Sequence, residues 1–448
     1  MVAKKHCSSF PCTDMIGHMP DPIRSHIVSF LPLKDAIRTS ILSRRWRRVC
    51  SSLSSLDFRK IRSRNDIKDI IDQTLFLNDG SNVKRFKLVV KVGKGYITDI
   101  HLHRWISFAL RHSVCELSLV VHEGELTTLP SSLFTSSTLT SLTLSDINLN
   151  LPSKVYFPVL KTVDLDKIFF FNGSRSCNLF SDCSCPMLET LTISCCEFAD
   201  FNILSISATS LKVVKLLDVD DDHALSFRLS NPNLRLIHYE GNKLPGFTSE
   251  TLSSLVNATF ELMSASSALN VAEKPVCKLL NGIHNVNTLK LRGHFIEVLT
   301  RIRDLFVYFG ALRCSLKHLE LIMDPTKEQL QVITFLLRIC SALQSLSICF
   351  FEAKDPPELP TINDCSQSKE LSTGHIPMNL RTVKIQEFQG SESEIGLVQY
   401  LLQNASSLEV MSIEYQNETI KHEDNRTRIS EKLLTFARVS PYARIFMS

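Results

Sequence analysis

One apolar pattern, Leu-x-x-Leu-x-Leu with other apolar residues in place of some leucines, returns along most of this 448-residue chain. Clear copies read LTSLTL, LKHLEL and LQSLSI. Their second halves alternate apolar and polar residues, which is the period of a strand with one buried face. A single copy cannot bury its own apolar side chains, so neighbouring copies must stack. The first positions of the thirteen copies are Val83, Val114, Leu139, Leu160, Leu188, Leu211, Leu234, Leu255, Val286, Leu316, Leu343, Leu380 and Leu408.

The spacing of these copies, 21 to 37 residues, is typical of irregular leucine-rich repeats. We therefore predict an α/β fold in which the strands form a curved parallel sheet and helices lie on the outside of the solenoid. The Asn or Cys that often follows such a strand is clear only at Cys196 and Asn242.

Between the apolar positions, the polar side chains of each strand point to the concave face of the sheet, because strand residues alternate faces. That face mixes hydroxyls with both signs of charge. Acidic residues such as Asp166 and Glu240 interrupt any basic stripe, which favours a protein target over nucleic acid. The residues expected to contact the target are Thr143, Asp164, Thr192, Lys215, His238, Lys290, Arg292, His318 and Glu320.

Ahead of the repeats, the segment MPDPIRSHIVSFLP predicts a short helix that Asp21 caps and Pro22 begins. A second helix is expected over Leu33 to Leu42, and Ser43 is placed to cap a third that carries Trp46 and Val49. On the first helix, Ile23, Ile27, Phe30 and Leu31 form one apolar stripe. Three helices of this size cannot bury that surface among themselves, so a partner must cover it.

The segment MPDPIRSHIVSFLPLKDAIRTSILSRRWRRV resembles the plant F-box. The resemblance implies that the chain docks a Skp-family adaptor, and through it a cullin and a RING subunit. The chain would then be the non-catalytic substrate-recognition subunit of an SCF-type ubiquitin ligase. By this resemblance, the residues divided between the F-box's own core and the adaptor-binding face are Met19, Pro20, Ile23, Ile27, Leu31, Pro32, Ala36, Ile37, Leu42 and Trp46.

Two alternatives stay open at this point. The basic string around Trp46 is also compatible with nuclear import, and the repeats could serve a nuclear interaction scaffold that binds a protein or nucleic acid without a ligase. A small molecule could assist target binding, which a deep basic pocket at the centre of the repeats would indicate.

The carboxyl-terminal segment IPMNLRTVKIQEFQGSESEIGLVQYLLQNASSLEVMSIEY resembles the FBD module of plant F-box proteins. It predicts a strand, a helix capped by Ser391 with Glu394 three residues on, and another strand that together cap the repeats. The expected organisation is a disordered N-terminus (1–13), the F-box (14–60), the repeats (61–351), an insert (352–374) and the FBD module (375–448).

No other chemistry is indicated. The first residues lack the apolar region of a signal peptide, so we expect a nuclear or cytoplasmic protein, not secreted, with reduced cysteines and no membrane span. The cysteines around Cys177 to Cys196 contain no C-x-x-C pair, and phosphate-loop and nucleophile motifs are missing. We therefore expect no metal, no cofactor and no catalytic residue.

Overall fold

The computed structural model divides the chain into two compact units, unit 1 (Met1–Phe171) and unit 2 (Asn172–Ser448). The predicted N-terminal segment 1–13 and the predicted insert 352–374 lie outside the described residues. The structure describes residues 15–16, 18–59, 61, 67–91, 97–122, 129–152, 154–171, 176–199, 202–219, 226–263, 273–283, 285–302, 315–351, 379–416 and 423–448.

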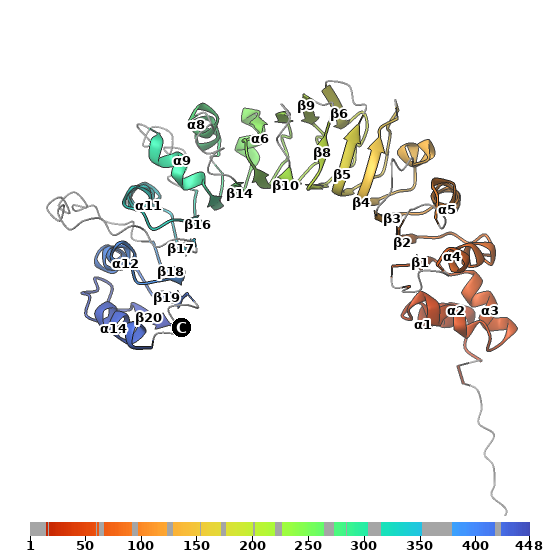
Figure 1. The fold of residues 1–448 in the computed structure, drawn as a ribbon, viewed down its shortest axis with the longest axis horizontal. Coiled ribbons are helices and arrows are strands. Elements are labelled where there is room, and N and C mark those ends of the chain that lie inside the picture. Colours follow the sequence, from red (N-terminus) through yellow and green to blue (C-terminus); the bar gives the residue numbers. More distant parts are fainter. Residues whose placement is uncertain are drawn as a thin grey trace, which may run out of the picture. The chain divides into compact units, whose positions relative to one another are not determined.

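Unit 1 begins with a group of short helices and continues as parallel strands that lie side by side in the order β1-β2-β3-β4-β5 (Figure 1). Its elements are α1 (Asp21–Ser29), α2 (Leu33–Thr39), α3 (Arg44–Ser51), β1 (Ser55–Asp57), α4 (Ile67–Phe76), β2 (Arg85–Lys91), α5 (Asp99–Arg111), β3 (Glu116–His122), η1 (Ser131–Thr135), β4 (Ser141–Asn150) and β5 (Thr162–Phe171).

Unit 2 contains one parallel sheet in the order β7-β10-β12-β14-β15-β16-β17-β18-β19-β20, and its helices lie on one side of that sheet (Figure 1). The first half of this unit contains β6 (Ser176–Phe180), β7 (Thr190–Ser194), β8 (Glu197–Phe198), β9 (Ile203–Ile206), β10 (Val213–Val219), β11 (Ser226–Leu229), β12 (Leu236–Gly241), β13 (Gly246–Phe247), α6 (Ser249–Ser254) and β14 (Asn257–Leu262). The second half contains α8 (Glu273–Gly282), β15 (Thr288–Gly293), α9 (Phe295–Arg301), β16 (His318–Met323), α11 (Lys327–Ile339), β17 (Ser345–Phe350), β18 (Thr382–Phe388), α12 (Glu392–Asn404), β19 (Val410–Tyr415), α14 (Glu423–Leu434) and β20 (Arg444–Met447).

The thirteen predicted repeats are confirmed. In every copy the strand begins two residues after the first apolar position of the pattern, from Arg85 after Val83 to Val410 after Leu408. All thirteen first positions are at most 1% exposed, so they form the core between the sheet and the outer layer. The apolar pattern therefore fixes both the start of each strand and the side chain that anchors it.

Part of unit 2 departs from the predicted outer layer of helices. There the outer layer is a second parallel sheet, in the order β13-β11-β9-β6. The copies that begin at Leu188, Leu211 and Leu234 are only 21 to 23 residues long. A strand rises about 3.3 Å per residue and a helix about 1.5 Å, so a strand spans the return path with fewer residues.

A left-handed residue recurs at one position relative to the starts of six strands, which the sequence pattern did not predict. Its φ angle lies between +45° and +61°, and it is always the sixth residue counted from the start of its strand. At Gly293 an added Cβ would lie 2.1 Å from the carbonyl oxygen of Leu262, so only glycine fits there. The residues in this conformation are Asp146, Lys167, Cys195, Asp218, Gly293 and Glu387.

The amino-terminal helices follow the prediction with two corrections. Pro20, not Asp21, is the N-cap of α1, because the Asp21 carboxylate in the first turn is drawn to Arg24 and Arg45. The second helix ends at Thr39, earlier than predicted. Ser43 caps α3 as expected, since its hydroxyl accepts a hydrogen bond from the Trp46 amide at 3.3 Å.

The predicted carboxyl-terminal strand, helix and strand are confirmed as β18, α12 and β19. Ser391 and Glu394 form a capping box at the start of α12. Helix α14 and strand β20 then extend the unit beyond the predicted elements. That this segment is an FBD module stays a prediction.

Replacing Glu394 should change how stability depends on pH. This side chain is 1% exposed, and its Oε2 accepts hydrogen bonds from the amides of Gln389, Gly390 and Ser391. Burial raises the Glu394 pKa more than these bonds lower it. A raised pKa in the folded protein means that the charged carboxylate destabilises the fold. Wild-type stability should therefore decrease as the pH rises from the Glu394 pKa of the unfolded chain to the Glu394 pKa of the folded chain. Glu394→Gln should therefore gain stability relative to wild type as the pH rises above about 4, the ordinary range of a glutamate pKa.

Thermal unfolding of both proteins across that pH range measures the effect. Glu392→Gln is the matched control, because Glu392 lies exposed in the same first turn of α12. A difference between wild type and Glu394→Gln that stays constant with pH would contradict the proposed cost of burying this carboxylate.

Candidate functional site

Helix α1 presents apolar side chains to solvent along one side. Ile23, Ile27 and Leu31 follow one another at four-residue intervals and remain 48%, 36% and 39% exposed. Residues four apart lie on the same face of a helix, so the three side chains make one stripe that continues past the end of α1. Exposed apolar stripes of this kind mark contact surfaces.

The ten residues predicted to take part in adaptor binding fall into three groups by burial. Ala36 and Trp46 are 1% and 8% exposed, so they belong to the internal packing of the three helices. Met19 and Ile37 are half-buried. The exposed ones are Pro20, Ile23, Ile27, Leu31, Pro32 and Leu42.

An arginine that the apolar pattern did not single out holds these helices together. The Arg24 side chain is fully buried, and its guanidinium lies 5.6 Å from the centre of the Trp46 ring. Asp21 pairs with Arg24 and also with Arg45, whose Nε lies 3.2 Å from the Asp21 Oδ1. The Arg24–Trp46 cation–π contact and the Asp21–Arg45 ion pair join α1 to α3. The isoleucines of α1 lie outside this contact and face outward.

The open face of unit 2 is the face of its sheet opposite the helices (Figure 1). On this face the strand register aligns polar residues in a continuous row from strand to strand. Five of the nine predicted target-binding residues occupy this row, and Arg292 and His318 lie in neighbouring rows of the same face. The other two, Thr143 and Asp164, are register partners in unit 1. In strand order the row is Thr192, Lys215, His238, Thr259, Lys290, Glu320, Ser347, Lys384 and Ser412.

Ion pairs cross-link the middle of this open face. Glu320 lies 2.5 Å from the Lys290 ammonium and 2.5 Å from the Arg292 guanidinium. Burial raises the pKa of Glu320, but the hydrogen bonds and charges of these two cations lower it further, so the pKa lies below its ordinary value. The carboxylate therefore stays charged and holds both cations in place.

A second group on the same face carries excess negative charge. Glu240 and Glu261 are register partners on β12 and β14, and Arg292 is the next partner on β15. Burial raises the pKa of both carboxyls, and the charge of Glu240 raises that of Glu261 further. Sequence reasoning missed Glu261, although it occupies the same strand position as Glu240 and Arg292.

His238 lies on β12, two residues before Glu240. Its Nε2 is 2.8 Å from Glu240 Oε1, although the geometry is not that of a hydrogen bond. Burial and the nearby charge of Arg292 lower the pKa of this histidine. The open face thus displays alternating acidic and basic groups, without a continuous basic stripe.

Among the described residues, no group of three or more His, Cys, Asp or Glu side chains is arranged to hold a metal ion. Cys183 and Cys185 are free thiols, and the Cys177 side chain lies outside the described residues. The Cys195 thiol lies 3.6 Å from Asp218 Oδ2, and the Cys196 thiol donates to the Ser194 carbonyl at 3.2 Å. None of the described helices has the length and apolar character needed to cross a membrane.

Comparison with known proteins agrees with this architecture. Residues 75–438 match the family model described as "At1g61320/AtMIF1, LRR domain", and residues 16–58 match the F-box domain. The chain is 28% identical to the putative F-box protein At3g58860 of Arabidopsis thaliana, over 89% of this chain and 88% of that protein.

Two further Arabidopsis thaliana proteins show the same extent of similarity. The F-box/LRR-repeat protein At4g14096 is 26% identical over 94% of this chain and 92% of its own length. The putative F-box/FBD/LRR-repeat protein At3g59240 is 27% identical over 94% of this chain and 85% of its own length. The similarity thus spans both the helical N-terminus and the repeats.

Proposed function

We propose a function from one premise: this chain belongs to the family of F-box proteins that carry a leucine-rich-repeat domain. Its domain composition is that of a substrate-recognition subunit of a ubiquitin ligase. In the proposed arrangement the F-box docks a Skp-family adaptor, which joins the chain to a cullin and a RING subunit. The repeats hold a protein target for ubiquitination.

The observation that carries the first half of this proposal is the exposed stripe Ile23, Ile27 and Leu31 on α1. Within the F-box match, Ala36 and Trp46 are used internally, whereas these three side chains face solvent. Covering them with the apolar surface of an adaptor would remove them from water, and that burial drives association. Pro20, Pro32 and Leu42 are exposed beside the same helices and complete the proposed contact surface.

The open face of unit 2 is the proposed site for the target. Its groups are half-buried and fixed by ion pairs, so they are already ordered before a target arrives, which reduces the entropic cost of binding. A target that carries both acidic and basic side chains complements the alternating charges on β12, β14, β15 and β16.

In this mechanism the chain contributes proximity and performs no bond chemistry. Holding a target close to the ubiquitin-carrying enzyme raises the effective concentration of the two reactants. No residue of this chain is therefore assigned a catalytic role.

Direct binding between the full chain and a purified Skp-family adaptor tests this proposal. We expect a Kd of about 1 µM or tighter, measured by calorimetry, because specific stable interfaces commonly reach that affinity. Failure to bind any of several adaptors would contradict the ligase role. It would leave the alternative, an interaction scaffold that works through the repeats alone.

A further inference from the structure

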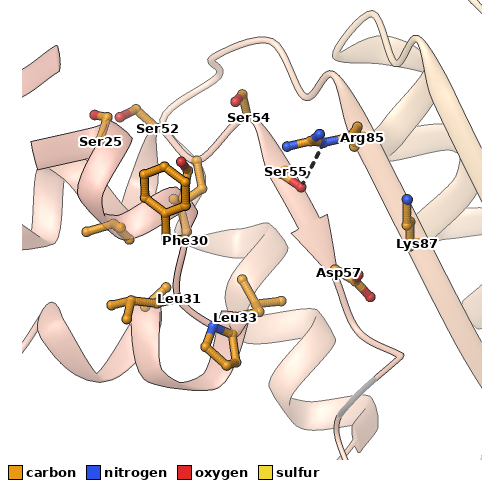
Figure 2. Close-up of a pocket in the computed structure, with 15 residues that line it drawn as sticks. Ser25, Phe30, Leu31, Leu33, Ser52, Ser54, Ser55, Asp57, Arg85 and Lys87 are labelled. Carbon is orange, nitrogen blue, oxygen red and sulfur yellow. Dashed lines mark hydrogen bonds between the residues drawn. The ribbon is translucent and has the colours of Figure 1, made fainter. Parts of the chain in front are cut away.

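A pocket of about 350 Å³ lies in unit 1, between the amino-terminal helices and the first two strands of the sheet. We call it the junction pocket. Figure 2 shows serine side chains and Arg85 along one side, with Phe30, Leu31 and Leu33 along another. The residues that line it are Ser25, Val28, Ser29, Phe30, Leu31, Pro32, Leu33, Ala36, Ser52, Leu53, Ser54, Ser55, Asp57, Arg85 and Lys87.

The charged groups of the junction pocket are predominantly positive. Arg85 and Lys87 lie two residues apart on β2, so their side chains project from the same face of the strand. The one carboxylate in the lining, Asp57, is already engaged by Arg59, whose Nη2 lies 2.7 Å from the Asp57 Oδ2.

Lys87 is the register partner of Asp57, whereas Arg85 forms no ion pair within the described residues. Burial raises the pKa of Asp57, but the hydrogen bonds and charge of Arg59, with the charge of Lys87, lower it below its ordinary value. The Arg85 Nε donates only a long hydrogen bond, 3.3 Å, to the Ser55 hydroxyl. Glu116 is the register partner of Arg85 on β3, yet within the described residues no ion pair joins the two.

The serine hydroxyls add hydrogen-bonding capacity beside these cations. Ser29 and Ser52 donate their hydroxyl protons to the backbone carbonyls of their own helices. Within the described part of the chain, the hydroxyls of Ser25 and Ser54 make no hydrogen bond, so they can donate to a ligand. The opposite wall carries the apolar side chains of Leu33 and Ala36, which are at most 7% exposed.

We propose that the junction pocket binds a small organic anion that has a carboxylate or phosphate joined to an apolar body about the size of an aromatic ring. The anionic group would meet Arg85, Lys87 and the free hydroxyls, as charge-assisted hydrogen bonds require. The apolar body would lie against Phe30, Leu31 and the floor of the pocket. A volume near the lower limit of small-molecule sites, about 300 Å³, restricts the ligand to a small one.

Titration of the full chain with phenyl phosphate, benzoate and benzyl alcohol, followed by saturation-transfer NMR, tests this site. We expect at least one of the two anions to bind with a Kd of about 1 mM or tighter, and the neutral alcohol at least roughly tenfold more weakly. Inorganic phosphate without the ring should also bind more weakly than phenyl phosphate. The ratio between phenyl phosphate and benzoate then identifies which anionic group the pocket prefers.

Arg85→Gln and Lys87→Gln should each weaken anion binding by roughly tenfold, because each removes a charge-assisted contact. Lys84→Gln removes the same charge from an exposed neighbour outside the pocket lining and should leave the affinity unchanged. Thermal unfolding confirms that each variant is folded. Equal affinity for the anions and the alcohol, or equal losses in all three variants, would overturn the proposed site. The titration uses the chain without an adaptor, because Leu31 and Pro32 belong both to the pocket lining and to the proposed adaptor surface. The inference does not rest on adaptor binding.

Discussion

Replacing Ile27 by aspartate is expected to weaken binding of a Skp-family adaptor by at least roughly 100-fold, a loss of about 2.7 kcal/mol. Ile27 is the central residue of the exposed stripe on α1, between Ile23 and Leu31. A carboxylate at this position would lose its water on docking without gaining a partner, and burying an unpaired charge is costly. The substitution should not unfold the helices, because the isoleucine already contacts solvent.

Ile100→Asp is the matched control for this experiment. Ile100 is 72% exposed on α5, in unit 1 but outside the F-box match. The same change in chemistry should therefore leave adaptor affinity within about twofold, since exposed substitutions away from an interface have small effects. Calorimetric titration of wild type and both variants gives the comparison. Wild-type affinity in Ile27→Asp, or equal losses in both variants, would remove α1 from the proposed adaptor surface.

The repeats could be predicted because their physics is local. Each strand requires apolar side chains at fixed positions, and residues such as Leu211 and Leu343 show those positions directly. The same argument placed five of the nine residues of the polar row on the open face, since strand residues alternate sides. Glu261 belongs to that face as well, and applying the alternation to every strand would have identified it.

Other features depend on contacts between segments that the pattern does not encode. Arg24 is buried because Trp46 and Asp21 provide a ring and a carboxylate around it. The Asp21 contact follows the i,i+3 spacing of a helix, whereas the contact with Trp46 on α3 is not implied by the 3.6-residue period. A rule that assigns charged residues to the surface fails for such paired groups. The prediction that Asp21 caps the helix could not take account of its contact with Arg45, which forms only where α1 and α3 meet.

The junction pocket is also a product of tertiary packing. Its cations come from β2, its hydroxyls from α1 and the segment before β1, and its apolar wall from α2. In the sequence, Ser25 and Arg85 are 60 positions apart and carry no shared motif. They line the same junction pocket because β1 lies beside the helices and pairs with β2.

The packing of α5 leads to the second large prediction. Trp105 is 1% exposed, and its indole Nε1 donates a hydrogen bond of 2.8 Å to the Asp72 carboxylate on α4. Trp105→Ala should lower the free energy of unfolding of unit 1 by about 3–5 kcal/mol, because it leaves a large cavity and an unpaired carboxylate. Trp105→Phe should cost less, about 1–3 kcal/mol, since it keeps most of the packing and loses only the hydrogen bond.

Hydrogen exchange with mass spectrometry distinguishes these outcomes by region. In Trp105→Ala, amides of α4, α5 and the adjoining strands β2 and β3 should exchange faster, while urea unfolding shifts to lower denaturant. Phe76→Ala is the matched control, because this aromatic side chain lies on α4 but is 87% exposed, and its loss should change stability by no more than about 0.5 kcal/mol. Equal destabilisation by Trp105→Ala and Phe76→Ala would mean that burial of the indole does not hold this part of unit 1 together. Equal losses in Trp105→Phe and Trp105→Ala would assign the stability to the Asp72 hydrogen bond, which both variants lack, against the cavity argument.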